Sequence, residues 1–255
     1  MDTVMITRVA EDRWEAVADD RIVGRGDVSQ RPDGRRFISV DAWQDAVFDR
    51  LAATMLTQLP EPLHTLVGEA DHDLKSSWER LGFTVGRREW EYVLPTRSYE
   101  TGLGGRQLPP GSVTILPAGE ADADLLRTLD RTIRAEVEAT VGWHTMPAEV
   151  LPRPAGCTPA DPSKYATAVR GGEYVGLIRV ARVRRRARIG LIAIRNDERR
   201  HGIGRALLTH ALDALHREGI DSAWAEVDVS NAAAIALAEG VGARRSGSCL
   251  ELVRR

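Results

Sequence analysis

Two halves of this 255-residue chain repeat one pattern, and the repeat restricts the fold more than any other feature. An offset of 152 residues superposes 14–28 on 166–180. An offset of 160 residues superposes the ends of the halves, with the matches Glu79/Glu239, Gly82/Gly242, Glu91/Glu251 and Val93/Val253. A repeat of this length indicates a duplicated domain and not a solenoid unit.

The domain boundary is predicted by composition. The stretch 95–112 is rich in proline and glycine, which is typical of a linker. We therefore expect a degenerate N-terminal domain over 1–97, a linker over 98–112 and a C-terminal domain over 113–255. The expected fold class is α/β (α+β), each domain being a mixed, mostly antiparallel sheet flanked by helices.

Hydrophobic periodicity places the elements of the second half. Apolar residues recur at helical spacing over 203–218, and Gly219 ends that segment. The predicted strands are 165–170, 174–183, 187–195, 222–229 and 248–254, and the predicted helices are 120–139, 203–218 and 231–240. The first half is shorter and lacks an opening pair of helices before its hairpin.

Overall composition excludes several classes of protein. With 43% hydrophobic and 28% charged residues, the chain reads as soluble and globular. A net charge of −2 gives no case for nucleic-acid binding. No stretch of 18 apolar residues occurs, so no membrane span is predicted. We expect a cytoplasmic protein, monomeric or homodimeric, that binds neither nucleic acid nor membrane.

The segment with the clearest chemistry joins a buried strand to a long helix. Gly202 and Gly204 lie where the helix begins, so backbone N–H groups and the helix dipole can face an anion. Such a turn suits a pyrophosphate, and glycine lets the backbone approach it closely. Arg199, Arg200 and Arg205 add positive charge nearby.

Other glycine-rich loops fit less well. The P-loop requires a lysine followed by serine or threonine, but Arg205 and Ala206 stand there. The dinucleotide fingerprint requires a third glycine, and Leu207 occupies its position. An ordinary tight turn remains the structural alternative.

Two motifs then carry a resemblance to a known family. Arg199-x-x-Gly202-x-Gly204 matches the Arg/Gln-x-x-Gly-x-Gly/Ala signature of GCN5-related N-acetyltransferases, here called GNAT. The segment from Glu226 to Leu237 resembles a second GNAT signature, notably of bacterial enzymes that acetylate the N-terminus of a ribosomal protein. The tandem layout is similar to two-copy acetyltransferases of the mycothiol synthase type, a likeness of architecture that says little about substrate.

The resemblance implies acetyl-CoA as the cofactor, with its pantetheine arm along the strand and its pyrophosphate on the loop amides. Asn231 corresponds to a family asparagine that contacts the cofactor, although it would also serve as a helix N-cap. No metal is expected. The expected cofactor-binding residues are Ile192, Ala193, Ile194, Arg199, Arg200, His201, Gly202, Ile203, Gly204, Arg205 and Asn231.

Catalysis requires that an amine with a pKa of about 10 lose a proton before it attacks. Glu226 matches the general base of the ribosomal-protein enzymes, although a solvent-facing carboxylate paired with arginine is the alternative. Asp228 shares its strand face and is the second candidate. The family tyrosine that protonates the leaving thiolate is replaced by Ala238; candidate replacements are Ser230, Ser246 and Tyr165.

The first half lacks the phosphate loop. The segment 42–48 has no glycine, and Asp45 and Asp49 would repel a pyrophosphate. We expect this half not to bind coenzyme A, and instead to support the second domain and shape the acceptor cleft.

The predicted function is an acyltransferase of the GNAT type. It moves acetyl from acetyl-CoA to the primary amine of a small molecule by direct attack in a ternary complex. A protein N-terminus or lysine is the alternative acceptor, and a non-catalytic coenzyme A-binding or structural module is the third reading. Two features have open roles: the arginine-rich stretch 182–188 and the loop 142–164 with His144 and Cys157.

Overall fold

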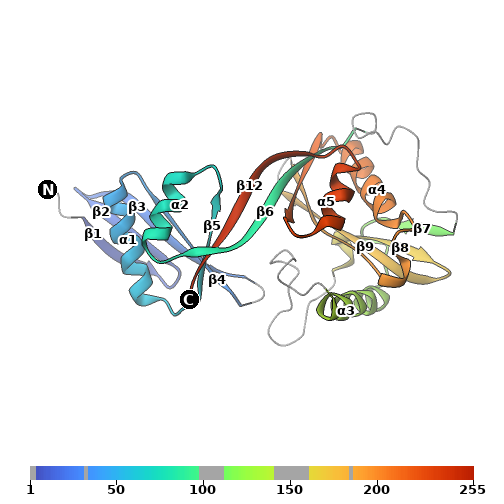
Figure 1. Ribbon diagram of the computed structural model, residues 1–255, viewed down its shortest axis with the longest axis horizontal. Coiled ribbons are helices and arrows are strands. Elements are labelled where there is room, and N and C mark those ends of the chain that lie inside the picture. Colours follow the sequence, from blue (N-terminus) through green and yellow to red (C-terminus); the bar gives the residue numbers. More distant parts are fainter. Residues whose placement is uncertain (1–3, 32–33, 98–111, 141–160, 184–185) are drawn as a thin grey trace. The chain divides into compact units, whose positions relative to one another are not determined.

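The computed structural model describes residues 4–31, 34–97, 112–140, 161–183 and 186–255. Most of the expected linker 98–112, and His144 and Cys157, lie outside the described residues. The chain forms two compact units. Unit 1 comprises Met1–Arg88 with Gly247–Arg255, and unit 2 comprises Glu89–Ser246. Figure 1 labels their elements.

Unit 1 is a sheet in the strand order β1-β2-β3-β4-β5-β12. All neighbours pair antiparallel except β4 and β5, which pair parallel. From Gly247 onward β12 belongs to this unit. The elements are β1 (Met5–Ala10), β2 (Arg13–Ala18), β3 (Arg21–Gln30), β4 (Arg36–Ala42), α1 (Asp45–Gln58), β5 (Leu63–Gly68), α2 (His72–Arg80) and β12 (Arg244–Arg254).

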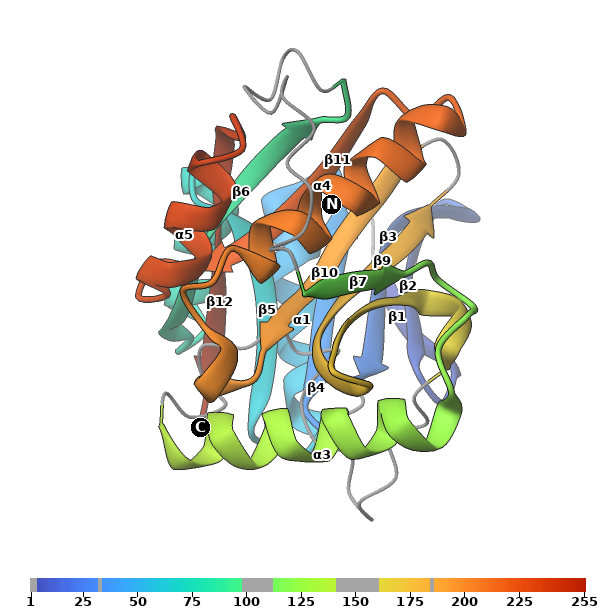
Figure 2. The ribbon, with the colours of Figure 1, turned by 90° about the vertical axis from the view of Figure 1, so that its right-hand side faces the viewer.

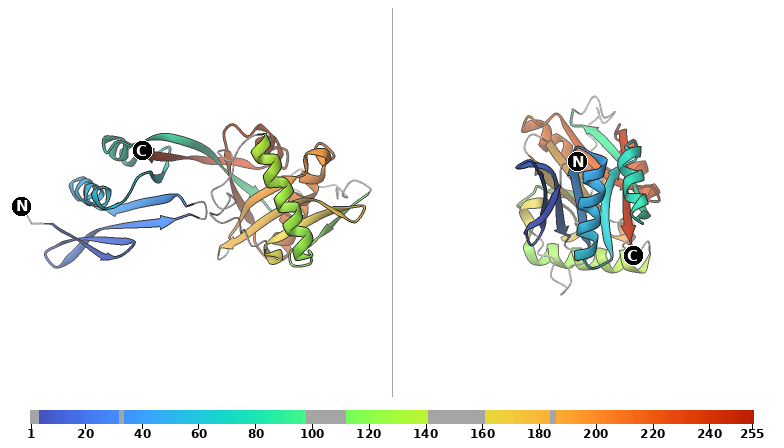
Figure 3. Two further views of the ribbon diagram at one scale, coloured as in Figure 1. Left: turned by 90° about the horizontal axis from the view of Figure 1, so that it is seen from below. Right: turned by 90° about the vertical axis from the view of Figure 1, so that its left-hand side faces the viewer.

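Both helices of unit 1 pack on the same face of its sheet (Figure 3). Apolar residues at alternate strand positions, such as Trp14 and Leu252, are fully buried against Leu51 of α1 and Trp78 of α2. α1 lies so close to β3 that a Cβ on Gly26 would come within 2.3 Å of a Met55 side-chain atom. A larger residue at position 26 would therefore require the Met55 side chain to move.

Unit 2 is a sheet in the strand order β6-β11-β10-β9-β8-β7. Its helices and strands confirm those expected over 120–240, including the end of the long helix before Gly219, whereas the expected strand 248–254 is part of β12 in unit 1. From Glu89 onward β6 belongs to this unit. The elements are β6 (Thr84–Pro95), β7 (Val113–Leu116), α3 (Ala123–Ala139), β8 (Tyr165–Arg170), β9 (Glu173–Val183), β10 (Arg186–Ile194), α4 (Ile203–Arg217), β11 (Ser222–Asp228) and α5 (Ala232–Glu239), with 3-10 turns at Pro162–Lys164 and Asn196–Glu198.

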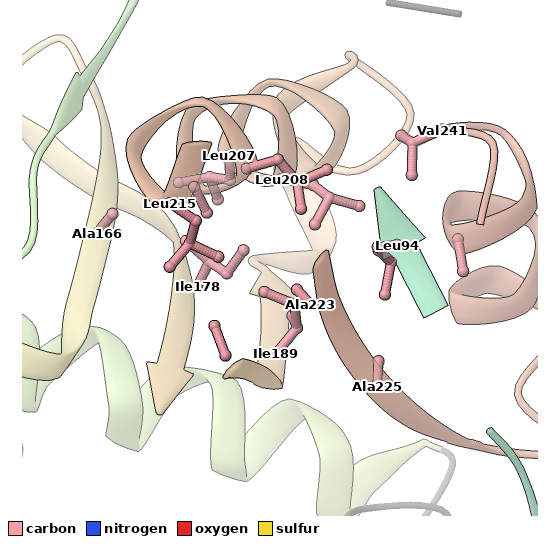
Figure 4. Packing of buried hydrophobic residues seen from close by; sticks show 14 of the residues in the cluster. Leu94, Ala166, Ile178, Ile189, Leu207, Leu208, Leu215, Ala223, Ala225 and Val241 are labelled. Carbon is pink, nitrogen blue, oxygen red and sulfur yellow. The ribbon is translucent and has the colours of Figure 1, made fainter. Parts of the chain in front are cut away.

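Helices cover both faces of the unit 2 sheet, as expected (Figure 2). On one face, Leu207 and Leu215 of α4 pack on the strand residues Ile178 and Ala223 (Figure 4). On the opposite face, α3 packs on Tyr165 and other residues that alternate with the first set. None of the described helices is long and apolar enough to cross a membrane.

The compact units differ from the boundaries expected at 97 and 113, because each unit ends its sheet with a strand from the other half of the sequence. β12 pairs with β5 through Glu251 and Leu66, and β6 pairs with β11 through Glu91 and Glu226. The exchange cannot be predicted from the repeat, because the last strand of each half has the same sequence pattern.

The exchange makes a stability prediction. Leu252 is fully buried in the core of unit 1, so Leu252→Ala should lower the free energy of unfolding by about 2–5 kcal/mol, as in other cores. Leu66→Ala is the control, because Leu66 is 43% exposed, and should cost less than about 1 kcal/mol. Urea unfolding measures both. Equal effects would show that the last strand does not stabilise unit 1.

Candidate functional site

The strands β10 and β11 separate soon after they meet. They pair in parallel at Ala187 with Ala223 and at Arg188 with Trp224, and the described residues beyond these form no further pairs between the two strands. A β-bulge at Gly190 shifts the register of β10 against β9 and bends the strand. Its last residues, Leu191–Ile194, thus keep β9 as a neighbour on one side while the edge toward β11 is open.

The open edge contains the three strand residues expected to hold the pantetheine arm. Ile192 and Ile194 pack on the core beneath α4, and Ala193 packs on the core beneath α3. All three are partly buried. A ligand strand laid against this edge would find backbone donors and acceptors between two apolar faces.

Ion pairs hold the turn that follows β10. The amide of Arg195 donates to the Val175 carbonyl at 3.0 Å, and its guanidinium pairs with Asp197 at 2.6 Å and Glu173 at 2.8 Å. These two carboxylates raise the pKa of Arg195, with the hydrogen bond to Asp197 as the larger cause. The Glu198 carboxylate pairs with Arg170. Both acidic side chains of the turn are therefore paired with arginine.

Next, the chain turns into α4 with its amides exposed. Arg200 has φ +66° and Gly202, the N-cap, has φ +78°, and no side chain caps the helix. The first amide that bonds back is Ala206, to the Gly202 carbonyl at 3.0 Å. Within the described part of the chain, nothing accepts from the amides of residues 200–205. These residues, which include His201 and Ile203, lie where the sequence predicts an anion cradle, and anion binding there stays a prediction.

Glycine also leaves space at this turn. A Cβ placed on Gly204 would meet Leu237 at 3.6 Å and Ile194 at 3.8 Å, which are ordinary contacts. The fold therefore has room for a Cβ at this position, and packing of the fold does not require glycine there.

Two arginines that flank the turn donate hydrogen bonds to backbone carbonyls. Arg199 donates to the Ile194 carbonyl at 3.3 Å, and Arg205 donates to the Gly240 carbonyl.

Asn231 is a helix N-cap. Its side chain accepts from the Ala234 amide at 3.1 Å at the start of α5. The predicted capping role is confirmed, and the cofactor contact stays a prediction.

Glu226 lies on β11, on the face opposite the α4 core. One carboxylate oxygen accepts from Arg188 Nε at 2.7 Å, and the other accepts from Trp224 Nε1 at 3.1 Å. The ion pair is largely buried, with 18% of the arginine and 21% of the glutamate side chain exposed. The carboxylate is thus fixed beside the strand separation. It also pairs with an arginine, as expected if Glu226 is a structural carboxylate and not a base.

The second candidate carboxylate has a local structural role. Asp228 is 7% exposed and accepts from the Ser230 amide at 2.9 Å and from its hydroxyl at 2.5 Å. This turn engages Ser230 as a donor. Ser246 donates to the Glu91 carbonyl at 3.3 Å, and Tyr165 is buried beneath α3, where burial raises its pKa. The structure does not favour any of these three hydroxyls as the proton donor that would replace the family tyrosine at position 238.

Sequence reasoning missed several residues around the site. Arg188 and Trp224 could have been found from strand alternation, because they share the face of Glu226. Glu91 and Tyr92 could not, because they come from the first half through the exchanged strand. The Tyr92 hydroxyl donates to Glu239 at 3.0 Å and accepts from Arg245 at 3.0 Å.

Within its described part, the basic stretch 182–188 contains two arginines with ion pairs, one on β9 and one on β10. Arg182 pairs with Glu218 at 2.5 Å, and Arg188 pairs with Glu226. Arg186 is exposed, and residues 184 and 185 lie outside the described part.

Unit 1 repeats the strand separation without the loop. β4 and β5 also pair at two positions, Arg36 with Leu63 and Phe37 with His64. Only two residues separate β4 from α1, and α1 begins with Asp45 in its first turn. The turn offers a carboxylate where unit 2 offers glycine amides, so an anion is disfavoured there.

Comparison with known proteins gives a family match over the segment that contains the loop. Residues 133–243 match the acetyltransferase (GNAT) family. Over 51 residues the chain is 53% identical to the [Ribosomal protein bS18]-alanine N-acetyltransferase of Escherichia coli K12, which is 20% of this chain and 34% of that protein. The chain thus spans about a third of the length of the curated relatives it matches.

Solved structures share the fold over nearly the whole chain. A GCN5-related N-acetyltransferase from Sphaerobacter thermophilus superposes with a TM-score of 0.68 at 14% identity, over 97% of this chain and 82% of that one. A tandem GNAT protein from the clavulanic acid biosynthesis pathway gives 0.68 at 15% identity, over 95% and 82%. The expected tandem fold is therefore confirmed.

The two loop glycines should differ in their effect on stability. Gly202→Ala forces a side chain to φ +78° and should lower the free energy of unfolding by about 1–2 kcal/mol. Gly204→Ala lies inside the first turn with room for a Cβ, and should be neutral or stabilising by up to about 1 kcal/mol. Thermal and urea unfolding measure both. A larger loss for Gly204→Ala would contradict the described turn.

Proposed function

We propose that this chain, which belongs to the acetyltransferase (GNAT) family, moves an acetyl group from acetyl-CoA to the primary amine of a small molecule. One observation carries the proposal: the open edge of β10 leads directly into a helix N-terminus whose first amides are not used by the fold. An extended chain with a diphosphate at its end is the ligand that such an arrangement fits.

The residues present fit acetyl-CoA. Residues 200–205 would hold the pyrophosphate through their amides, with Arg199, Arg200 and Arg205 nearby, and Ile192–Ile194 would pair with the pantetheine arm. The ion pairs of Asp197 and Glu198 with arginines reduce the repulsion that these carboxylates would exert on a phosphate. When bound, acetyl-CoA supplies an activated thioester.

An ammonium acceptor loses two protons, and one proton can be returned to the thiolate. The first proton leaves before attack; the nitrogen then bonds to the acetyl carbon and loses its second proton, the carbon–sulfur bond breaks, and the thiolate can take up a proton. Glu226 is the carboxylate that we propose for the first proton, directly or through water, because it is fixed beside the strand separation. The leaving thiolate needs little assistance, since a thiol pKa is about 8.5. This accounts for an alanine at 238.

A protein N-terminus is the second candidate acceptor. It is favoured by the 53% identity over 51 residues to an enzyme named for acetylating an alanine of ribosomal protein bS18. A panel that contains small amines and a peptide with N-terminal alanine distinguishes the two.

Charge reversal at the loop tests cofactor binding. Gly204→Asp should reduce acetyl-CoA affinity at least about 100-fold, because it places a carboxylate next to the proposed diphosphate site at a position with room for a Cβ. Gly204→Asn is the matched neutral control and should lose less. Calorimetry should show one acetyl-CoA per chain. Unchanged affinity in the aspartate variant, or two equal sites, would contradict the assignment.

Removal of the proposed base should lower kcat. Glu226→Gln keeps the shape and should reduce kcat about 10²–10⁴-fold at neutral pH, the usual contribution of general-base catalysis, with acetyl-CoA affinity unchanged. Thiol release with an acceptor amine measures it. The same kcat as the native chain would show that Glu226 is a structural partner of Arg188 only.

A further inference from the structure

Glu91 lies directly opposite Glu226 in the antiparallel pairing of β6 and β11. Opposite residues in such a pair project from the same face, about 4.5–5.5 Å apart at their Cβ atoms. Their neighbours Tyr92 and Ala225 point to the core beneath α4 and α5. The exchanged strand therefore places a second carboxylate beside the proposed base.

The two opposite carboxylates differ in their hydrogen-bond and ion-pair partners. Arg188 and Trp224 occupy the two oxygens of Glu226. Glu91 is exposed, and in the described ranges its carboxylate has neither an ion pair nor a hydrogen bond. Arg188 thus pairs with Glu226, and the Glu91 carboxylate opposite it stays accessible to a ligand.

The internal repeat supplies an independent comparison. Glu251 is the counterpart of Glu91 in unit 1, opposite Leu66 on β5. It accepts from Arg35 at 2.5 Å and lies 3.1 Å from His64 Nδ1, with 12% of its side chain exposed. The counterpart of His64 in unit 2 is Trp224, which donates to Glu226 instead. The degenerate unit has neutralised this carboxylate, whereas the unit with the cofactor loop has not.

We propose that Glu91 binds the ammonium group of the acceptor amine next to Glu226, which then takes its proton. The proposal rests on the proposed function. An alkyl amine arrives protonated at neutral pH, and a carboxylate is the natural partner of an ammonium. A carboxylate beside the amino group would meet Glu91 and an already engaged Arg188. The acceptor class is thus a cationic amine without an adjacent carboxylate, such as an amino sugar, a diamine or a peptide N-terminus.

The test separates binding from turnover. Glu91→Gln should raise the KM for the amine about 10- to 100-fold, the loss expected for one hydrogen bond to a charged group. The kcat and the KM for acetyl-CoA should stay within about 3-fold, unlike Glu226→Gln, which acts on kcat. Glu79→Gln, on the surface of α2 in a pair with Lys75, is the control and should change nothing.

A matched pair of acceptors sharpens the result. Alanine amide and alanine differ only in the carboxylate next to the amine, so the native chain should prefer the amide, and Glu91→Gln should reduce that preference. An unchanged amine KM in Glu91→Gln, with Glu226→Gln still impaired, overturns this proposal and leaves the proposed function intact. A fall in kcat alone also overturns it.

Binding without turnover gives a second readout. 1,4-Diaminobutane is titrated into the protein saturated with coenzyme A. Weaker binding to Glu91→Gln than to the native chain supports the proposal, and equal or undetectable binding to both overturns it. Failure of the native chain to acetylate any amine, with diamine binding that depends on Glu91, would reject the proposed function alone.

Discussion

The separation of β10 from β11 is the constraint on which the rest of the site depends. After two parallel pairs the strands diverge, helped by the bulge at Gly190. One strand then leads to the unused amides at the start of α4, and the other carries Glu226 along the opening. The open edge of β10, the helix N-terminus with its unbonded amides and the position of Glu226 thus follow from one break in sheet pairing, and α3 and α4 pack on opposite faces of this sheet.

The duplicated unit shows what the separation alone does not provide. β4 and β5 diverge after the same two pairs, yet a two-residue connection leads into an acidic first turn, and Glu251 is neutralised by Arg35 and His64. Unit 1 thus keeps the fold but has neither the glycine amides at the helix start nor an unpaired glutamate at the position of Glu251. Its exchanged strand still contributes Glu91 and Tyr92 to the other unit.

Much of this structure follows from local signals in the sequence. The amphipathic pattern that ends at Gly219, the paired glycines and the capping asparagine all act within a few residues, so the helices of unit 2 and the loop were predictable. The strand exchange was not, because Glu91 and Glu251 occupy equivalent positions and either strand satisfies either sheet. An arginine partner of Glu226 was predicted only as an alternative. Which arginine it is depends on the pairing of β10 with β11, which brings Arg188 beside Glu226.

Backbone hydrogen exchange with and without coenzyme A tests the central claim most directly, because it reports on individual amides. The account predicts that coenzyme A slows exchange at 200–205 and along Leu191–Ile194, while the equivalent turn of unit 1 between Ala42 and Asp45 is unaffected. Protection at the unit 1 turn, or none at 200–205, would contradict it.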